Sequence, residues 1–216
     1  MIEGIVYKSI DYKETSKIIY LYTPIGKVSL KVSGLNKKNN PFKSFTITGN
    51  IVKFDMTNSN FPSLVDYEMV KSPLNYLSDI NYLEALGIFI NVISYIPEDT
   101  DNEKTYMFVE KMLKLLDKNP KKILSIFLIK MLYVFGVTPN LKECHQCGSS
   151  DNLVFFDYHN GVSYCNKCSG YDNNYHIWYE YYYSKLDPLT LNDTNYDQLL
   201  DTIAIYFKKF VNFDIK

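Results

Sequence analysis

The pattern of apolar and polar positions in the first 70 residues predicts β-strands. The clearest run is KVSLKVS at residues 27–33, with one apolar and one basic face. A turn at residues 23–26, with proline and glycine, separates it from the β-branched and aromatic run 17–23. Further strands are expected at residues 2–10, 45–56 and 64–70. Five short strands with short connections predict an OB-fold barrel, because closing the sheet removes its unpaired edges.

The hydrophobic period becomes helical at about residue 78. Apolar residues then recur at three- and four-residue steps until Pro97 ends the run. Thr100 and Glu103 form a capping box that would open a second helix. Residues 119–136 predict a third helix, with an Asn-Pro start and a glycine at its end. The remaining expected elements are a tyrosine-rich piece at 175–183 and a last helix from about residue 194.

These patterns predict an α+β multidomain chain. An N-terminal five-stranded OB-fold β-barrel would occupy residues 1–76, and a helical domain residues 77–216. An inserted four-cysteine element, similar to a zinc ribbon, is expected at residues 141–170. A chain of 216 residues is long enough for each domain to have a core.

The insertion contains two Cys-x-x-Cys pairs, Cys144 with Cys147 and Cys165 with Cys168. Seventeen residues separate the pairs, a spacing typical of a two-knuckle zinc site. Between them, residues 153–164 read as two short strands around a turn. We therefore expect one structural Zn²⁺ ion held by four thiolates, in a closed site that leaves no position for a reactive water.

Other uses of the cysteines are open at this point. Two disulfides fit the count, although disulfides are rare in the cytoplasm. A thioredoxin-like redox pair would stand at a helix start in a βαβ setting, which the pattern lacks. A four-cysteine cluster without metal is the third alternative.

Composition favours a cytoplasmic protein with no membrane segment. No run of about 18 apolar residues occurs, and the N-terminus lacks the features of a signal peptide. All 23 basic residues are lysine and the net charge is −1. The charge is uneven, however: residues 1–56 hold nine lysines and four acids, whereas residues 57–100 hold one lysine and six acids.

Catalytic motifs are missing from the sequence. It has no phosphate-binding loop, dinucleotide fingerprint, nucleophile elbow or His-Glu-x-x-His motif. The three histidines and scattered acids supply few catalytic groups. We therefore expect that the protein is not an enzyme.

Two motifs together resemble the RecO family of bacterial recombination mediators. The first is EGIVYKSIDYKETSKIIYLYTPIGKVSLKVSGLNKK at residues 3–38. The second is FGVTPNLKECHQCGSS at residues 135–150, followed by NGVSYCNKC at residues 160–168. The cysteine pattern alone is common to many folds, but the two motifs in this order and at this chain length are fairly specific.

The resemblance implies a non-catalytic role in recombinational DNA repair, in the RecF pathway. Proteins of this family bind single- and double-stranded DNA and anneal complementary strands. They act with RecR and contact the C-terminal tail of single-strand-binding protein, and so help to load RecA. The implied location is the cytoplasm, in association with the nucleoid.

A basic surface on the barrel would bind phosphates with release of counterions. Its candidate residues are Lys8, Lys13, Lys17, Lys27, Lys31, Lys37, Lys38 and Lys43. Candidates for base stacking are Tyr7, Tyr12 and Phe42. Candidates for binding the acidic partner tail, beside apolar helix stripes, are Lys121, Lys122, Lys130, Lys208 and Lys209.

Two other classes of function compete with this one. A zinc-ribbon adaptor that binds proteins and not DNA would suit the net charge and the missing arginines, since lysine lacks the bidentate phosphate contacts of arginine. An RNA-binding OB-fold protein would prefer folded RNA to single-stranded DNA.

Overall fold

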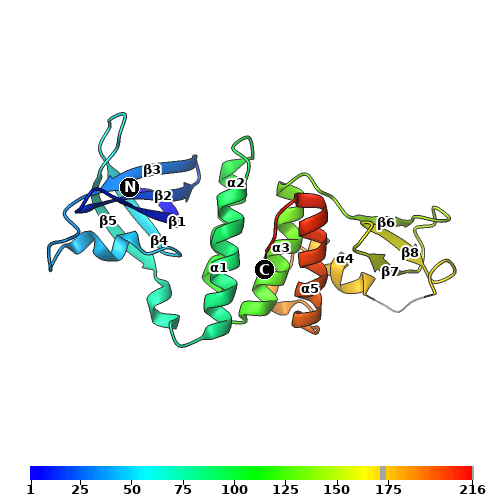
Figure 1. Ribbon diagram of the computed structural model, residues 1–216. Coiled ribbons are helices and arrows are strands. Elements are labelled where there is room, and N and C mark those ends of the chain that lie inside the picture. The colour runs from blue at the N-terminus through cyan, green and yellow to red at the C-terminus, as the bar shows by residue number, and fades with distance from the viewer. Residues whose placement is uncertain (171–173, 216) are drawn as a thin grey trace. The chain divides into compact units, whose positions relative to one another are not determined.

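The computed structural model describes residues 1–170 and 174–215. The chain divides into two compact units, residues 1–118 and residues 119–216. The first unit contains the N-terminal sheet and two helices, and the second contains the cysteine element and the remaining helices (Figure 1). The predicted boundary at residue 76 lies inside the first unit, and the division into domains 1–76 and 77–216 stays a prediction.

The first unit begins with a five-stranded antiparallel sheet in the order β3-β2-β1-β4-β5. Its strands are β1 (Ile2–Tyr12), β2 (Ser16–Thr23), β3 (Gly26–Val32), β4 (Ile51–Met56) and β5 (Leu64–Lys71). The two outer strands meet where the Lys31 N–H donates to the Pro62 carbonyl at 2.8 Å and Lys31 bridges Ser63. This contact joins the two outer strands of the five-stranded sheet, as the predicted barrel requires.

The barrel core follows from the alternation of the strands. The inward-facing residues are apolar and buried, and burial of each large one stabilises the fold by about 1.5–3 kcal/mol. They are Val6, Ile19, Leu21, Leu30, Val32, Phe45, Val52, Phe54 and Leu64.

One predicted strand is shorter than expected. Residues 45–56 were expected to be extended, but Pro41–Thr46 is a 3₁₀ helix and β4 begins only at Ile51. The side chain of Asn40 accepts a hydrogen bond from the Phe42 N–H, and proline follows at the first helical position. This Asn-Pro start places the ring of Phe45 in the barrel core.

Two helices complete the first unit, α1 (Ile80–Tyr95) and α2 (Asn102–Leu115). Helix α1 contacts β1, and α2 contacts β2. The predicted capping box of α2 is wrong, because Asp101 and not Thr100 is the N-cap and accepts from the Lys104 N–H. The Thr100 hydroxyl instead donates to the Pro97 carbonyl.

Helix α3 (Pro120–Val134) is the centre of the second unit, as its wide apolar stripe predicts. Asn119 caps it by accepting from the Lys122 N–H at 3.2 Å. Helix α3 contacts both α4 (Tyr175–Tyr183) and α5 (Tyr196–Tyr206). A π-helical turn, Phe207–Val211, follows α5 directly. In the described part of the chain, no helix is long and apolar enough to cross a membrane.

The cysteine element is a three-stranded sheet in the order β6-β8-β7 (Figure 1). Strands β7 (Leu153–Asp157) and β8 (Val162–Cys165) form the predicted antiparallel pair. Their turn contains Gly161 at a φ of +71°, a backbone conformation that favours glycine. Strand β6 (Asn140–Cys144), which pairs parallel with β8, was not predicted because five residues show no clear alternation.

Candidate nucleic-acid interface and metal site

The outer face of β1, β2 and β3 combines lysines with aromatic and apolar side chains. Directly paired residues of antiparallel strands project to the same side of a sheet. Ile19 and Leu30, which pair with each other, point into the core, so the residues on either side of them point outward. The two outward rows are Lys8–Tyr20–Ser29 and Ile10–Ile18–Lys31.

Helices cover one end of this face. Tyr22 is fully buried, and its ring centroid lies 6.0 Å from that of Tyr106 in α2. The Lys27 ammonium donates to the carbonyls of Ser94 and Ile96, at 2.8 Å and 2.7 Å, where α1 ends. Burial lowers the pKa of Lys27. Lys27 therefore satisfies carbonyls at a helix C-terminus, and we leave it out of the proposed DNA-binding surface.

The other end of the face is open. Tyr12, at the end of β1, is 36% exposed, and Phe61, in the loop between β4 and β5, is 46% exposed. Their rings meet edge to face, with centroids 5.9 Å apart. The Lys13 ammonium lies 5.3 Å from the Tyr12 ring centroid, and the Lys31 ammonium 5.9 Å from that of Phe61. An aromatic pair with a cation at each ring thus faces solvent.

The remaining candidate lysines of the barrel differ in what they contact. The Lys8 ammonium lies 5.5 Å from the Tyr20 ring centroid on the open face. Lys17 forms an ion pair with Asp11 at 3.3 Å. Three exposed lysines, Lys37, Lys38 and Lys43, lie between β3 and β4. Among the described residues, none of Lys8, Lys13, Lys31, Lys37 and Lys38 forms an ion pair.

The three aromatic residues predicted to stack on bases differ in their exposure to solvent. Tyr12 is exposed, whereas Tyr7 is half-buried beside Tyr20. Phe42 packs against the barrel core and contacts the Tyr67 ring at 6.2 Å, so we leave it out of the surface. Sequence reasoning missed Phe61, although a single aromatic in the polar loop TNSNFPS was a usable signal.

The four cysteine sulfurs converge at one point of the second unit. All four lie within 4.8 Å of one another, and Cys147 Sγ is 3.8 Å from Cys165 Sγ. A tetrahedral zinc–thiolate site has Zn–S bonds of about 2.3 Å, which places its sulfurs about 3.8 Å apart. The backbone forms tight turns at both knuckles, with Gly148 N–H donating to the Cys144 carbonyl and Cys168 N–H to that of Cys165. The arrangement can hold a metal ion.

The backbone favours thiolate at two of these sulfurs. Burial opposes ionisation of Cys144, but backbone hydrogen bonds outweigh it and lower its pKa to about 6. The pKa of Cys165 is also lowered by backbone hydrogen bonds, again against burial. The pKa of Cys168 is raised to about 12, first by hydrogen bonding with Cys147 and then by burial. A cation among the sulfurs would relieve the repulsion between thiolates, so the donor set fits a metal.

The cysteine sheet is anchored to the helices by aromatic rings. Phe156 of β7 is fully buried, with its centroid 4.7 Å from Trp178 in α4 and 6.0 Å from Tyr206 in α5. At the β7–β8 turn, the Lys209 ammonium donates to the carbonyl of His159. The ribbon is therefore part of the core of its unit.

The lysines predicted to bind a partner tail all have contacts inside the second unit. Lys122 is buried and its ammonium donates to the Leu191 carbonyl at 2.6 Å and to Asp193 at 2.9 Å. The Lys130 ammonium donates to the Ser184 carbonyl at 2.7 Å, and burial lowers its pKa. The other three contacts are Lys121 with Asp197, Lys208 with Asp214, and Lys209 with His159. The ammonium groups of Lys122 and Lys130 thus have acceptors inside the unit, and tail binding by these five lysines stays a prediction.

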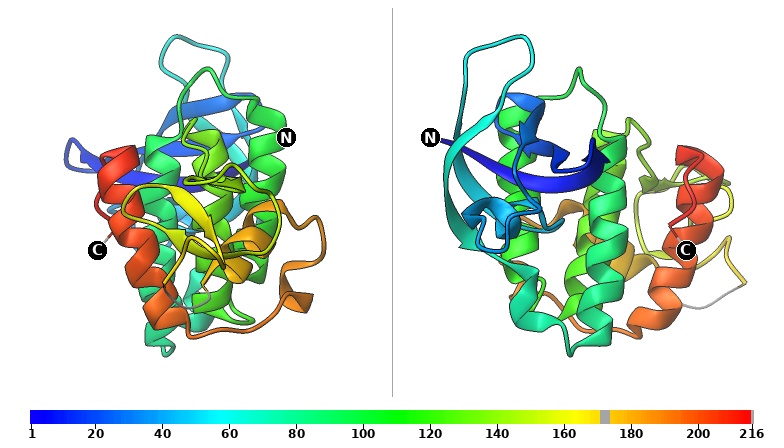
Figure 2. Two further views of the ribbon diagram at one scale, coloured as in Figure 1. Left: turned by 90° about the vertical axis from the view of Figure 1, so that its right-hand side faces the viewer. Right: turned by 60° about the vertical axis from the view of Figure 1, so that its left-hand side comes forward.

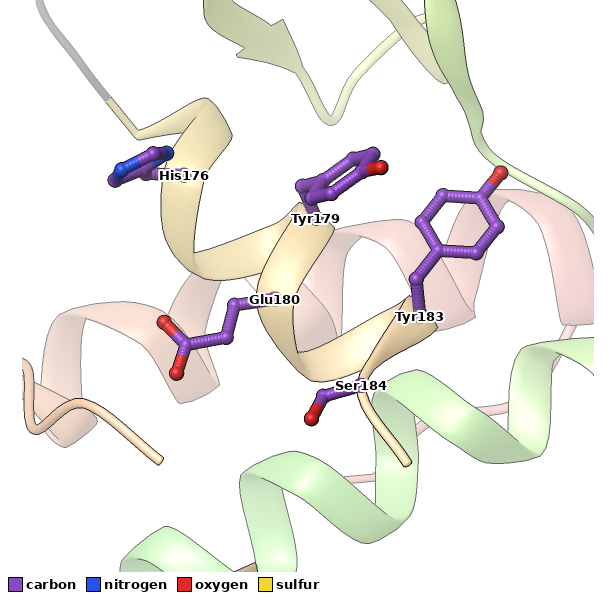
Figure 3. A pocket seen from close by; sticks show the side chains of 5 residues that line it. All are labelled: His176, Tyr179, Glu180, Tyr183 and Ser184. Atoms are coloured by element: carbon purple, nitrogen blue, oxygen red, sulfur yellow. The ribbon is translucent and has the colours of Figure 1, made fainter. Parts of the chain in front are cut away.

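A hollow of about 420 Å³ lies along α4. Figure 3 shows His176 and Glu180 on one side of this helix and Tyr179 and Tyr183 on another, with Ser184 directly after its end. Both carboxylate oxygens of Glu180 accept hydrogen bonds from Asn192. These bonds tie Glu180 to the segment after α4.

Comparison with protein families gives two adjoining matches. The model for "Recombination protein O N terminal" matches residues 1–73, and the model for "Recombination protein O C terminal" matches residues 77–185. Together they cover the barrel, most of the helices and the cysteine ribbon.

Individual relatives match across the same regions. The chain is 26% identical to the DNA repair protein RecO of Bacillus subtilis strain 168, over 99% of this chain and 90% of that protein. It is 27% identical to the Enterococcus faecalis protein of the same name, over 99% of this chain and 88% of that protein. The corresponding Mycoplasma capricolum protein is 24% identical over 78% of this chain and 69% of its own length.

Proposed function

The chain belongs to the RecO family, and from this premise we propose that it is a non-catalytic mediator of recombinational DNA repair. It binds single- and double-stranded DNA and anneals complementary strands. With RecR and the C-terminal tail of single-strand-binding protein, it helps to load RecA. It works in the cytoplasm, in association with the nucleoid.

The observation that carries this proposal is the open barrel face. Lys13 and Lys31 lie beside the exposed rings of Tyr12 and Phe61, and Lys8 beside the partly buried ring of Tyr20. Among the described residues no acid pairs with these three lysines. Phosphates bound there release counterions, so affinity falls as salt rises. The exposed loop lysines Lys37 and Lys38 extend the positive charge beyond the sheet.

Annealing follows from the same physical features. Two strands repel each other through their phosphates, and bound ammonium groups reduce that repulsion. Lysine makes point-charge contacts and not the bidentate contacts of arginine, so the strands are held without a fixed geometry. Bases of a strand held by its backbone remain available for pairing with the second strand. The reaction makes and breaks no covalent bond.

We propose Zn²⁺ as the ion of the four-cysteine site. Cys144, Cys147, Cys165 and Cys168 would hold it, and a four-thiolate ion has no position for a substrate or water. The ion would supply folding energy to the ribbon. Elemental analysis is expected to find one zinc per chain, and none after Cys165→Ser. Protein without zinc but with two disulfides would contradict this assignment.

The first test of function is titration of a fluorescent single-stranded oligonucleotide at two salt concentrations, with metal-loaded protein. We expect binding that weakens steeply with salt, and faster annealing of complementary strands when protein is added. No binding at low salt would favour a protein-binding adaptor, and tighter binding to folded RNA would favour an RNA-binding protein.

A separate test addresses the partners. Immobilised single-strand-binding protein should retain this chain, and a version without its acidic tail should not. Equal retention by both versions would exclude the tail as the contact.

A further inference from the structure

The loop between β4 and β5, residues 57–63, is fixed at its base. The Thr57 N–H donates to the Ser63 carbonyl, and the Ser63 N–H donates to the Thr57 hydroxyl, both at 2.9 Å. The Pro62 carbonyl accepts from the Lys31 N–H at 2.8 Å, which joins the loop to β3. The loop stands clear of the barrel (Figure 2, cyan). Its base is therefore rigid although its tip is surrounded by solvent.

Phe61 is held in place by this arrangement. It directly precedes Pro62, and a residue before proline is restricted to extended conformations. Its ring is 46% exposed and rests edge to face on the Tyr12 ring. A large apolar ring held in solvent on a fixed loop gives little stability to the fold, because much of its surface stays hydrated. It is, however, already positioned for a flat ligand.

The charges around the two rings fit a strand of nucleic acid. The Lys31 and Lys13 ammonium groups lie 5.9 Å and 5.3 Å from the centroids of Phe61 and Tyr12. Asp11, the acid adjoining Tyr12, is in an ion pair with Lys17, and Glu14 is exposed in the next turn. An aromatic platform with cations on two sides matches a base flanked by two phosphates.

We propose that Phe61 and Tyr12 form a binding site for one unpaired nucleobase, with Lys31 and Lys13 contacting the phosphates on either side of it. The inference rests on the proposed function and adds to it a residue and a selectivity. Bases inside a duplex are stacked on each other and cannot reach Phe61. The site therefore selects single strands, whereas the lysines alone bind either form.

The variant Phe61→Ala tests the site. We expect its affinity for a single-stranded oligonucleotide to fall about tenfold, since loss of one stacked base costs on this order. Affinity for a duplex should change by less than about twofold, and the salt dependence should not change, because no charge is removed. Affinity for an abasic oligonucleotide of the same length should be equal for variant and wild type.

Two further variants serve as controls. Phe61→Trp keeps a flat ring and should bind single strands at least as well as wild type. Tyr133→Ala removes a ring that is 75% exposed on α3 and should leave all affinities unchanged. Circular dichroism and the melting temperature of each variant establish that it is folded.

The outcomes separate this inference from the proposed function. If wild type binds single strands and anneals them, but Phe61→Ala matches it, the base site is wrong and the proposed function stands. An equal loss for single strands, duplex and abasic strand would make Phe61 a structural residue and also overturn the site. If wild type binds no single strand at low salt, both proposals fail.

Discussion

Lysines of the barrel face and lysines of the second unit are put to different uses. Lys8, Lys13 and Lys31 lie beside aromatic rings at a solvent-facing surface. Lys122 and Lys130 instead donate to backbone carbonyls, of Leu191 and Ser184 respectively. Lysine, which replaces arginine throughout this protein, therefore supplies both a surface charge and an internal hydrogen-bond donor.

The difference depends on which carbonyls lie within reach. Carbonyls at the ends of helices lack partners within the helix, and a long flexible side chain can supply the donor. Lys130 meets this need at the end of α4, and Lys27 meets it at the end of α1. A lysine with such acceptors nearby is structural, wherever it lies in the chain.

The largest effect is expected for Lys122→Met. The substitution keeps the volume but leaves the Leu189 and Leu191 carbonyls without their donor. Hydrogen bonds to a charged, buried donor are strong, so unfolding free energy should fall by about 2–4 kcal/mol. Chemical denaturation measures this loss, and affinity for single-stranded DNA should be unchanged in the folded protein. A variant that kept its stability but bound DNA more weakly would mean that Lys122 acts in DNA binding and not in the fold.

Replacing Lys8, Lys13 and Lys31 together by Gln should weaken DNA binding and leave stability nearly unchanged. Affinity for single strands should fall about 10- to 100-fold. The salt slope, which is the steepness of the fall of log affinity with log salt concentration, should decrease by about 2, because about 0.7 counterion is released per phosphate contact. Unfolding free energy should change by less than about 0.5 kcal/mol.

A matched control replaces three exposed lysines elsewhere, Lys53, Lys111 and Lys185, by Gln. It changes the net charge equally and should leave the salt slope near that of wild type. Equal slopes for the two triple variants would mean that net charge, and not the barrel face, governs binding.

Lys27→Met sharpens the comparison inside the first unit. Lys27 lies on β3 with Lys31, one of the proposed DNA-binding lysines, but donates to the end of α1. We expect a loss of about 1–2 kcal/mol in unfolding free energy, since two carbonyls lose a charged donor but remain partly solvated. The salt slope for DNA should not change. A lower slope would return Lys27 to the DNA-binding surface.

The smallest expected effect is a loss of unfolding free energy at acid pH. Lys71, also in the first unit, hydrogen bonds to Asp117 and to the Lys114 carbonyl. Burial raises the pKa of Asp117, but Lys71 outweighs it and holds that pKa below the ordinary 3.8. A lowered folded pKa contributes stability above the unfolded value, which is lost as pH falls through the folded value. Wild type should therefore lose more stability than Asp117→Asn between about pH 5 and pH 3, as measured by urea denaturation. If the unfolding free energies of wild type and Asp117→Asn fell equally over this pH range, the ion pair of Lys71 with Asp117 would contribute little to stability.

Much of the fold is predictable because it depends on local periods. Alternation gives the barrel strands, three- and four-residue steps give α1 and α3, and cysteine spacing gives the ribbon. Asp101 shows the limit at a helix start, since two neighbouring residues are both good caps and only the backbone decides between them.

The uses of individual lysines could not be predicted in this way. Lys27 finds its acceptor 67 residues along the chain, and Lys122 finds Leu191 at a separation of 69. No local pattern encodes such distant partners. Phe61 has no periodic neighbours, and its significance depends on closure of the barrel beside Lys31.

The single tryptophan gives the second unit an optical label of its own. Trp178 is fully buried against Phe156, on the strand that precedes the second cysteine pair. Excitation at the red edge of protein absorbance bypasses the many tyrosines and reports on this position alone. Emission should shift to longer wavelength when the ribbon opens and the indole meets water. Metal loading and DNA binding can thus be followed separately in one sample, by indole emission and by an oligonucleotide dye.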